Sequence, residues 1–356
     1  QLIDDIRNAI ANNQLMLFYQ PKVNMKTGVI LGAEALLRLN HPERGILAPD
    51  SFLPTMSNHP VFIEIGEWVL HQALNDLEKS LIAHQVFPIS INISPYHLQQ
   101  EHFLSNLKDI LIEHPKVRSN LIELEILETE VLTNISGIKK LINECKRIGV
   151  LFALDDFGTG YSSLTYLKEL PASKVKLDQS FVRDIMNKPE NIPILKACIQ
   201  MCKLLKREVI AEGVENIEIG KLLLYLGCTQ AQGYKISKPM SLENCCQWSK
   251  KWGSFPEWNI STERQKEGRL LINAIIGHFA RVDVLKNFLI LNESSMMEIL
   301  KKCPLHIWLN RQRHLITDKN KIKLMQLYEM HSVIYAETLE IFKLQQQGKK
   351  TLANKR

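Results

Sequence analysis

The sequence predicts an α/β protein: a (β/α)₈ TIM-like barrel with an antiparallel first strand, followed by a small C-terminal all-α helical domain. Three observations predict this fold class. Short apolar runs alternate with longer amphipathic segments about eight times through residues 1–250. Acidic and amide residues stand at the ends of most of these runs. After Lys250 no strand-like run remains and only helical patterns follow.

The expected strands and helices follow from this alternation. The strands are Met16–Tyr19, Val29–Leu39, Phe87–Ile93, Leu121–Leu127, Val150–Leu154, Lys174–Leu177, Glu208–Ala211 and Gln230–Ile236. The helices between them are Glu67–His84, His97–Glu113, Glu130–Ile148, Gln179–Lys206 and Ile217–Leu226. The turn-rich segment Asn24–Gly28 predicts a hairpin, so the first strand is expected to run antiparallel to the rest. An open doubly wound sheet is the alternative fold.

Changes in pattern divide the chain into four parts. A barrel over residues 1–250 is followed by a linker over 251–261, which the residues Gly253-Ser254-Phe255-Pro256 mark. A helical domain is expected over 262–347 and a basic tail over 348–356. The expected helices of that domain are Thr262–Leu291, Ser294–Gln312 and Lys319–Gln347.

Composition limits the cellular compartment and the classes of ligand that we expect for the chain. The net charge of +6 over 356 residues permits an anionic ligand. It does not indicate a coat of polymeric nucleic acid, because no long Lys/Arg run lies outside the tail. The seven cysteines are irregularly spaced, and no apolar run approaches the roughly 18–20 residues that span a bilayer. We therefore expect a reduced, cytoplasmic protein, or the cytoplasmic part of a longer one, with no membrane segment.

Oxygen-bearing side chains and one lysine gather at the ends of the expected strands, where barrel enzymes place their active sites. They are Glu34, Asn92, Glu125, Glu128, Asp155, Asp156, Lys176, Glu212 and Gln232. One carboxylate there can simply cap the next helix. Several on one face repel one another unless cations neutralise them. Because the cluster contains no Cys or His, it suits Mg²⁺ or Mn²⁺ better than Zn²⁺.

Two of these features indicate phosphodiester chemistry. The adjacent residues Asp155 and Asp156 can serve two metal ions, which clamp the attacking and leaving oxygens of a phosphoryl displacement. Lys176 can hold or help to deprotonate the attacking water. The glycine-containing loop Phe157-Gly158-Thr159-Gly160 follows directly and predicts a tight, mobile lid beside the metals. An ordinary strand-to-helix turn is the alternative for that loop.

The motifs along residues 1–250 resemble those of one known family. They are Tyr19-Gln20-Pro21, Glu34-Ala35-Leu36-Leu37-Arg38, His41-Pro42, Asn92-Ile93-Ser94, Glu125-Ile126-Leu127-Glu128, Asp155-Asp156-Phe157-Gly158-Thr159-Gly160-Tyr161-Ser162-Ser163-Leu164, Lys176-Leu177-Asp178, Ala211-Glu212-Gly213-Val214-Glu215 and Gln232-Gly233-Tyr234. Their order and spacing resemble the EAL-domain phosphodiesterases, which hydrolyse the bacterial messenger cyclic di-GMP to linear pGpG. The family's barrel also has an antiparallel first strand.

The resemblance implies a role for each strand-end residue. The first metal ion would be bound by Glu34, Asn92, Glu125 and Asp155. The second would be bound by Asp155 and Asp156, with Glu212 and Lys176 ordering or activating the water. The dinucleotide would be held by Gln20, Leu36, Arg38 and Gln232. Arg38 suits phosphate because its guanidinium is a planar fork of donors. Glu128 and Glu215 would support the ligands from behind, Glu128 by anchoring the loop that carries the two aspartates.

The chain departs from the family pattern at a few positions. Leu39 stands where Trp is usual, Leu127 replaces a usual Thr, and Thr55–Pro60 lacks a usual acidic residue. None of these changes removes an expected metal ligand, so we expect a two-metal cyclic di-GMP phosphodiesterase. A receptor that binds the dinucleotide without cutting it is the alternative, and a docking scaffold is a third. Because the loop after Asp156 lies next to surface helices, we also expect a homodimer.

The C-terminal domain carries a second resemblance. The segment Cys303-Pro304-Leu305-His306-Ile307-Trp308 is similar to the core of the chemoreceptor zinc-binding domains, which bind Zn²⁺ through three His and one Cys. The resemblance implies His278, Cys303 and His331 as ligands, whereas the position of a fourth is Tyr335. The fourth ligand would be His306 or a water molecule, and three protein ligands with water form an acceptable zinc site. A helical bundle that dimerises or links, with incidental histidines, is the alternative.

Overall fold

The computed structural model describes residues 2–53, 59–128, 135–158, 164–287 and 303–312. The chain divides into two compact units, Gln1–Ile260 and Ser261–Arg356. Each unit is described by itself.

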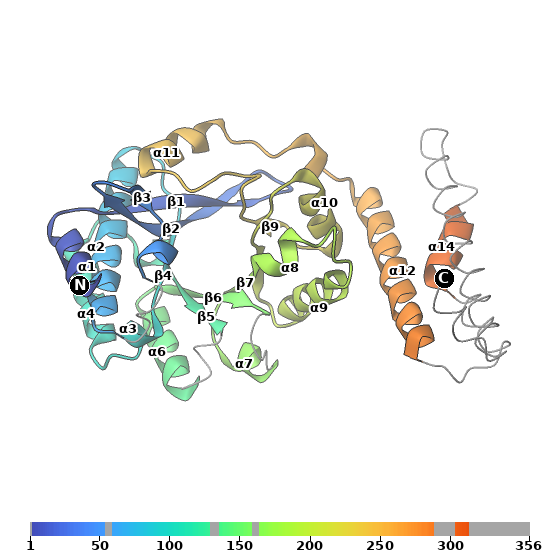
Figure 1. Ribbon diagram of the computed structural model, residues 1–356, viewed down its shortest axis with the longest axis horizontal. Helices are drawn as coiled ribbons and strands as arrows, with labels where there is room; N and C mark the ends of the chain where they lie inside the picture. Colours follow the sequence, from blue (N-terminus) through green and yellow to red (C-terminus); the bar gives the residue numbers. More distant parts are fainter. Residues whose placement is uncertain (1, 54–58, 129–134, 159–163, 288–302, 313–356) are drawn as a thin grey trace. The chain divides into compact units, whose positions relative to one another are not determined.

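Nine strands of the described residues form one sheet in the first unit, and eight of them close into a barrel (Figure 1). The barrel strands are β1 (Leu15–Asn24), β2 (Ile30–His41), β4 (Ile89–Asn92), β5 (Ile122–Leu127), β6 (Leu151–Phe157), β7 (Lys174–Leu177), β8 (Glu208–Ala211) and β9 (Gln230–Ala231). Strand β1 runs antiparallel to both of its neighbours, β2 and β9, and the other barrel pairs are parallel. The short β3 (Gly45–Leu47) pairs with β2 outside the barrel. The predicted barrel with an antiparallel first strand is confirmed, and closure through β1 rules out the open sheet.

The turn between β1 and β2 explains the antiparallel start. The side-chain oxygen of Asn24 accepts from the backbone N–H groups of Lys26 and Thr27 at 3.0 and 3.1 Å. Gly28 has a φ of 74°, and its N–H donates to the Asn24 carbonyl at 2.8 Å. Asn side chains favour such turns and glycine adopts positive φ without strain. The register that results places Gln20 opposite Glu34 and Lys22 opposite Gly32.

Helices cover the outside of the strands (Figure 1). They are α1 (Leu2–Ala11), α2 (Val61–Ile82), α3 (Pro95–Leu98), α4 (Phe103–Glu113), α6 (Ile135–Arg147), α7 (Leu164–Glu169), α8 (Gln179–Arg183), α9 (Asn191–Leu204), α10 (Ile217–Leu226) and α11 (Leu242–Lys251), with 3₁₀ turns at Pro49–Ser51, Ser119–Leu121 and Pro256–Trp258. Apolar side chains such as Ile89, Leu124 and Val175 fill the space among strands and helices with no exposed surface. Tyr19 of β1 joins this layer and donates its hydroxyl to Asp76 of α2 at 2.8 Å.

Two expected helices are each divided in two, and several strands have different ends. Strand β1 continues beyond the expected Tyr19 to Asn24. The segment His97–Glu113 becomes α3 and α4, and Gln179–Lys206 becomes α8 and α9. Pro189 lies between α8 and α9, and proline interrupts a helix because its N–H is missing. Strand β6 extends beyond the expected Leu154 to Phe157, so it contains both aspartates. Strand β9 ends at Ala231 rather than Ile236, so Gln232 follows the strand instead of lying in it.

The barrel unit continues through residues expected to be a linker. Trp258 is completely buried, and its Nε1 donates to the Ile217 carbonyl of α10 at 3.1 Å. Trp252 donates to the Gly28 carbonyl in the β1–β2 turn at 2.9 Å. Phe255 packs edge-on against both tryptophans, with ring centroids 5.7 and 4.8 Å away. These contacts explain why the compact unit ends at Ile260.

A chain that ends after Ile260 is therefore expected to unfold at the denaturant midpoint of the barrel in the longer chain. A chain that ends after Lys250 loses Trp258 and is expected to be less stable by at least about 3–5 kcal/mol, the cost of deleting a buried tryptophan side chain. Urea unfolding of the two truncated chains, followed by fluorescence and circular dichroism, measures the difference. Equal midpoints would show that residues 251–260 contribute nothing to the barrel.

The second unit is helical in its described part. It contains α12 (Thr262–Asn287) and α14 (Pro304–Gln312), and the small core of Ala274, Cys303, Leu305 and Leu309 lies between them. Gly277 lets the two helices approach, because a Cβ there would collide with the ring of Pro304. The expected helix Lys319–Gln347 and the basic tail lie outside the described residues. No described helix is long and apolar enough to cross a membrane.

Candidate active site at the carboxyl ends of the strands

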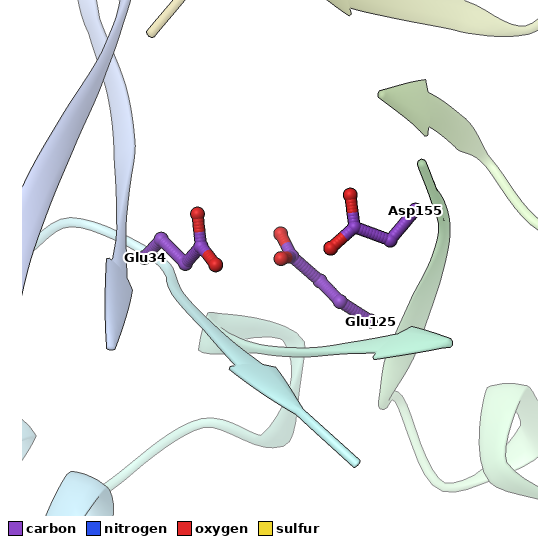
Figure 2. Close-up of side chains that lie close together, drawn as sticks. All are labelled: Glu34, Glu125 and Asp155. Atoms are coloured by element: carbon purple, nitrogen blue, oxygen red, sulfur yellow. The ribbon is translucent and has the colours of Figure 1, made fainter. Parts of the chain in front are cut away.

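Carboxylates from separate strands converge at one end of the barrel. Glu34 of β2, Glu125 of β5 and Asp155 of β6 point toward a common centre (Figure 2). One oxygen of each lies within 4.8 Å of the others, and one oxygen each of Asp155, Asp156 and Glu212 form a second such group. The two groups share Asp155. A shared carboxylate between two oxygen-rich groups is the arrangement that binds two hard cations side by side.

Amide side chains fix the orientation of Glu34. Asn92 of β4 donates its Nδ2–H to Glu34 Oε1 at 2.7 Å, which leaves the Asn92 carbonyl oxygen as a donor atom for a cation. Gln232 donates to Glu34 Oε2 at 2.7 Å and to Gln20 Oε1 at 2.9 Å. Both oxygens of Glu34 are therefore held before any ligand binds, which is the preorganisation that catalytic sites require.

Lys176 of β7 lies among the carboxylates of both groups. Its Nζ is 2.5 Å from Glu125 Oε2 and 2.8 Å from Glu212 Oε1. It is also 3.0 Å from Asp155 Oδ2 and 3.3 Å from Glu34 Oε2. Burial lowers the pKa of Lys176, but these carboxylates outweigh burial and raise it well above its usual value. Lys176 is therefore a buried cation, suited to binding an anion or a water molecule beside Glu212.

One lysine does not neutralise all the carboxylates. Burial raises the pKa of Glu34, but Lys176, Lys22 and the two amides outweigh burial and lower the pKa to about 2. Burial also raises the pKa of Asp156, and with the neighbouring charge of Asp155 brings it to about 7. For Glu212, burial together with Asp155 and Glu34 raises the pKa to about 8 despite Lys176. The site thus holds more acidic groups than its own cation can keep ionised, and its donor set fits divalent hard cations.

The backbone after Asp155 is held in an unusual conformation. Asp156 has a φ of 52°, a left-handed value that costs about 1 kcal/mol or more for a residue with a side chain. Gly158, with a φ of 104°, donates its N–H to Glu128 Oε2 at 2.9 Å. The contact expected between Glu128 and this loop is therefore present. Phe157 is buried at the end of β6, whereas Thr159 and Gly160 lie outside the described residues.

A cavity of about 480 Å³ opens over the carboxylates. The four expected substrate-binding residues, Gln20, Leu36, Arg38 and Gln232, all line it. Arg183 of α8 lines it as well, although sequence reasoning did not select this residue. Arg183 Nε lies 2.8 Å from Glu215 Oε1, so Glu215 supports the wall of the cavity. Arginine side chains at the cavity wall suit a ligand with phosphate groups.

Sequence reasoning also missed the role of the charged residues below the site. Three charged residues each lie two positions from a site residue on the same strand: Lys22 from Gln20, Glu123 from Glu125 and Lys174 from Lys176. Lys22 and Glu123 are 1% exposed. Residues two apart on a strand point to the same face, so the spacing alone predicts that these side chains enter the barrel. The signal was present in Gln20-Pro21-Lys22 and Glu123-Leu124-Glu125.

Gly233 holds the loop that carries Gln232. A Cβ at Gly233 would lie closer to the backbone N and O of Val214 than any real side chain does. Val214 N–H donates to the Gln232 carbonyl at 3.1 Å, so the loops after β8 and β9 lie directly against each other. This approach sets the position of Gln232 relative to Glu212.

The Gly233→Ala variant is expected to lose about 1–3 kcal/mol of unfolding free energy, because overpacking forces the two loops apart. Gly253→Ala is the matched control, since nothing lies within 4 Å of a Cβ at that position. Chemical denaturation of both variants measures the difference. An equal stability of the two variants would mean that the two loops can separate without cost.

In the C-terminal unit, two of the three expected zinc ligands lie together. His278 Nδ1 of α12 is 3.4 Å from Cys303 Sγ, and Cys303 has no exposed surface. The third, His331, lies outside the described residues.

The fold and the carboxylate groups together define a (β/α)₈ barrel domain with an oxygen-rich centre, the architecture of metal-dependent barrel hydrolases. Residues 3–239, more than half of the chain, match the family described as EAL domain. The chain belongs to the EAL-domain family.

Two curated relatives are about one third identical to this chain over the aligned residues. The bifunctional diguanylate cyclase/cyclic di-GMP phosphodiesterase MucR of Pseudomonas aeruginosa is 35% identical over 244 residues, which is 68% of this chain and 36% of MucR. The cyclic di-GMP phosphodiesterase NbdA of the same organism is 33% identical over 243 residues, 68% of this chain and 31% of NbdA. The chain thus spans about a third of the length of these two relatives.

Solved structures resemble the barrel. The PaMucR phosphodiesterase in complex with c-di-GMP is 34% identical, with a TM-score of 0.66, over 69% of this chain and 99% of that one. The EAL enzyme Bd1971 in its cAMP- and cyclic-di-GMP-bound form is 36% identical, with a TM-score of 0.64, over 69% of this chain and 67% of that one.

Proposed function

We propose that the barrel hydrolyses cyclic di-GMP to linear pGpG by a two-metal mechanism. The observation that carries the proposal is the pair of carboxylate groups joined by Asp155 beneath a cavity lined by Arg38 and Arg183. The names of MucR and NbdA, and the c-di-GMP complex of PaMucR, support the choice of substrate.

The charges of the site support two divalent ions rather than one. The two groups contain five carboxylates, those of Glu34, Glu125, Asp155, Asp156 and Glu212. All but Asp156 lie within 3.3 Å of Lys176 Nζ. With Lys176 charged, about four negative charges remain when all five are ionised, which matches two divalent cations. Glu34, Asn92, Glu125 and Asp155 would hold one ion. Asp155, Asp156 and Glu212 would hold the other.

The chain's own residues then have defined tasks. When bound, two divalent ions would polarise the phosphodiester and make a water molecule more acidic. Glu212 and Lys176, whose charged atoms are 2.8 Å apart, would orient that water and hold its proton. Arg38 would bind a phosphate oxygen. The hydrogen-bonded amides of Gln20 and Gln232 would hold Glu34 in position relative to the substrate.

Incubation with cyclic di-GMP and either Mg²⁺ or Mn²⁺, followed by chromatography, tests the proposed function. We expect linear pGpG with metal and none after chelation with EDTA. Tight binding of cyclic di-GMP without product under either metal would instead identify a receptor. If the chain neither binds nor cleaves cyclic di-GMP, a docking scaffold is the remaining function.

Metal binding is expected to strengthen as the pH rises from about 6 to about 8. Asp156 and Glu212 have pKa values raised to about 7 and about 8, so each holds a proton over part of this range and must lose it to bind a cation. Protons should therefore be released on binding at neutral pH. Calorimetry with Mn²⁺ in two buffers of different ionisation enthalpy counts them. An affinity that does not change with pH, with no proton release, would contradict the assignment.

We also propose that the C-terminal unit binds zinc through His278 and Cys303. The 3.4 Å separation of His278 Nδ1 and Cys303 Sγ supports this, because both atoms are zinc donors. We expect zinc to copurify with the wild-type chain and to be lost in the Cys303→Ala variant. If the wild-type chain contains no stoichiometric zinc, the zinc proposal is wrong and a plain helical bundle is the remaining interpretation.

A further inference from the structure

A second charged layer lies beneath the carboxylates of the active site. Lys22 of β1, Ser90 of β4, Glu123 of β5 and Lys174 of β7 form it, each two positions below a residue of the upper layer on its own strand. Barrel interiors are usually filled at this level by branched apolar side chains. The proposed function uses none of these four residues, so their presence needs another reason.

Lys22 joins this lower layer to the active site. Its Nζ contacts Ser90 Oγ and lies 3.2 Å from Glu123 Oε1 and 3.1 Å from Glu125 Oε1. The other oxygen of Glu125 lies 2.5 Å from Lys176 Nζ. Glu125 is thus held between two lysines, with Lys22 below and Lys176 among the metal-binding carboxylates.

The other members of the layer hold Lys22 in place. Ser90 donates its hydroxyl to Glu123 Oε1 at 2.7 Å, and Lys174 Nζ lies 2.7 Å from Glu123 Oε2. Glu123 is therefore held by Lys22, Ser90 and Lys174 together. Burial lowers the pKa of Lys22, but Glu125 and Glu123 outweigh burial and raise it to about 12, so Lys22 is charged. A buried ion pair gives little net stability over apolar packing, so a role in positioning is a better reason for it.

We propose that Lys22 is a positioning residue for metal binding: it holds one oxygen of Glu125 so that the other faces the first metal ion. The inference rests on the proposed function, because it assigns a metal to Glu125. Lys176 does not hold Glu125 alone, since its Nζ is shared among four carboxylates. Lys22 is anchored from below by Glu123 and Ser90, away from the mouth of the site.

The charge of Lys22 and its contact with Glu125 have opposite expected effects on metal affinity when Lys22 is removed. Lys22 is a cation near the proposed metal ion, so its loss by charge alone would tighten metal binding. Loss of the contact with Glu125 would weaken metal binding about 10- to 100-fold, the usual effect of removing a group that orients a ligand. A variant that keeps the net charge separates the two effects.

The double variant Lys22→Met/Glu123→Gln removes one positive and one negative charge together. It leaves no unpaired buried charge from the Lys22–Glu123 pair, which favours folding. The matched control is Lys174→Met/Glu123→Gln. It makes the same change of charge in the same layer but keeps Lys22 with its contacts to Glu125 and Ser90.

Mn²⁺ binding to wild type and both double variants, measured by titration calorimetry and by electron paramagnetic resonance, tests the inference. We expect the Lys22 variant to bind Mn²⁺ about 10- to 100-fold more weakly than the Lys174 variant. We also expect most of its kcat to return at saturating Mn²⁺. Equal affinities of the two variants, or a tighter Lys22 variant, would overturn the inference while leaving the proposed function intact. A wild type that binds no Mn²⁺ would overturn the proposed function itself.

Discussion

The Glu34→Gln variant is expected to cleave cyclic di-GMP about a thousandfold more slowly than wild type. Glu34 contributes to the first carboxylate group and accepts from both Asn92 and Gln232, so the amide removes a charged group that we propose as a metal ligand and disturbs both neighbours. A metal ion contributes several kcal/mol to a phosphoryl transition state, and about 1.4 kcal/mol corresponds to a factor of ten in rate. Initial rates of pGpG formation at saturating Mn²⁺ measure the change.

Glu208→Gln is the matched control for this variant. Glu208 begins β8 at the opposite end of the strand from Glu212, and its exposed carboxylate accepts from the Gln230 amide at 3.2 Å. We expect its rate to equal that of wild type. A Glu34→Gln rate within about tenfold of wild type would show that the metal does not depend on this carboxylate.

The Lys176→Met variant is expected to lose about 3–5 kcal/mol of unfolding free energy in the absence of metal. Lys176 lies within 3.3 Å of four carboxylates, and removing one partner from a buried ion network leaves charge without compensation. Added Mn²⁺ is expected to restore part of this loss, because it neutralises the same carboxylates. Denaturation with and without Mn²⁺ measures both effects.

The partly exposed residue Lys221 supplies the control. Its ion pair with Glu218 lies on the surface of α10, so Lys221→Met is expected to change stability by less than about 1 kcal/mol with or without metal. If Lys176→Met were as stable as wild type in EDTA, Lys176 would not be needed to compensate the charge of these carboxylates. The two-metal charge balance would then lose its support.

The sequence predicted the upper layer of the site because strand ends are local features. Glu34, Glu125 and Asp155 each close or interrupt an apolar run, and parallel strands bring such positions to one edge. The contacts between them depend on register. Gln20 reaches the same level as Glu34 only because β1 runs antiparallel and pairs Gln20 with Glu34.

Other features missed from the sequence depend on contacts between distant segments. The residues Gly253-Ser254-Phe255-Pro256 indicate a loop, and the backbone there is irregular as expected. The anchoring of that loop by Trp258 against Gly220 depends on a partner 38 positions away, which no local pattern contains. The close approach of Gly233 to Val214, just after the short last strand, is likewise a contact between distant segments.

The number of Mn²⁺ ions bound at the barrel tests the two-metal account most directly. A chain ending after Ile260, titrated with Mn²⁺ and followed by electron paramagnetic resonance, is predicted to bind two ions that are magnetically coupled through Asp155. The Asp155→Asn variant is predicted to lose the coupling and at least one ion. A single uncoupled Mn²⁺ in the wild-type barrel, with full formation of pGpG, would contradict the account.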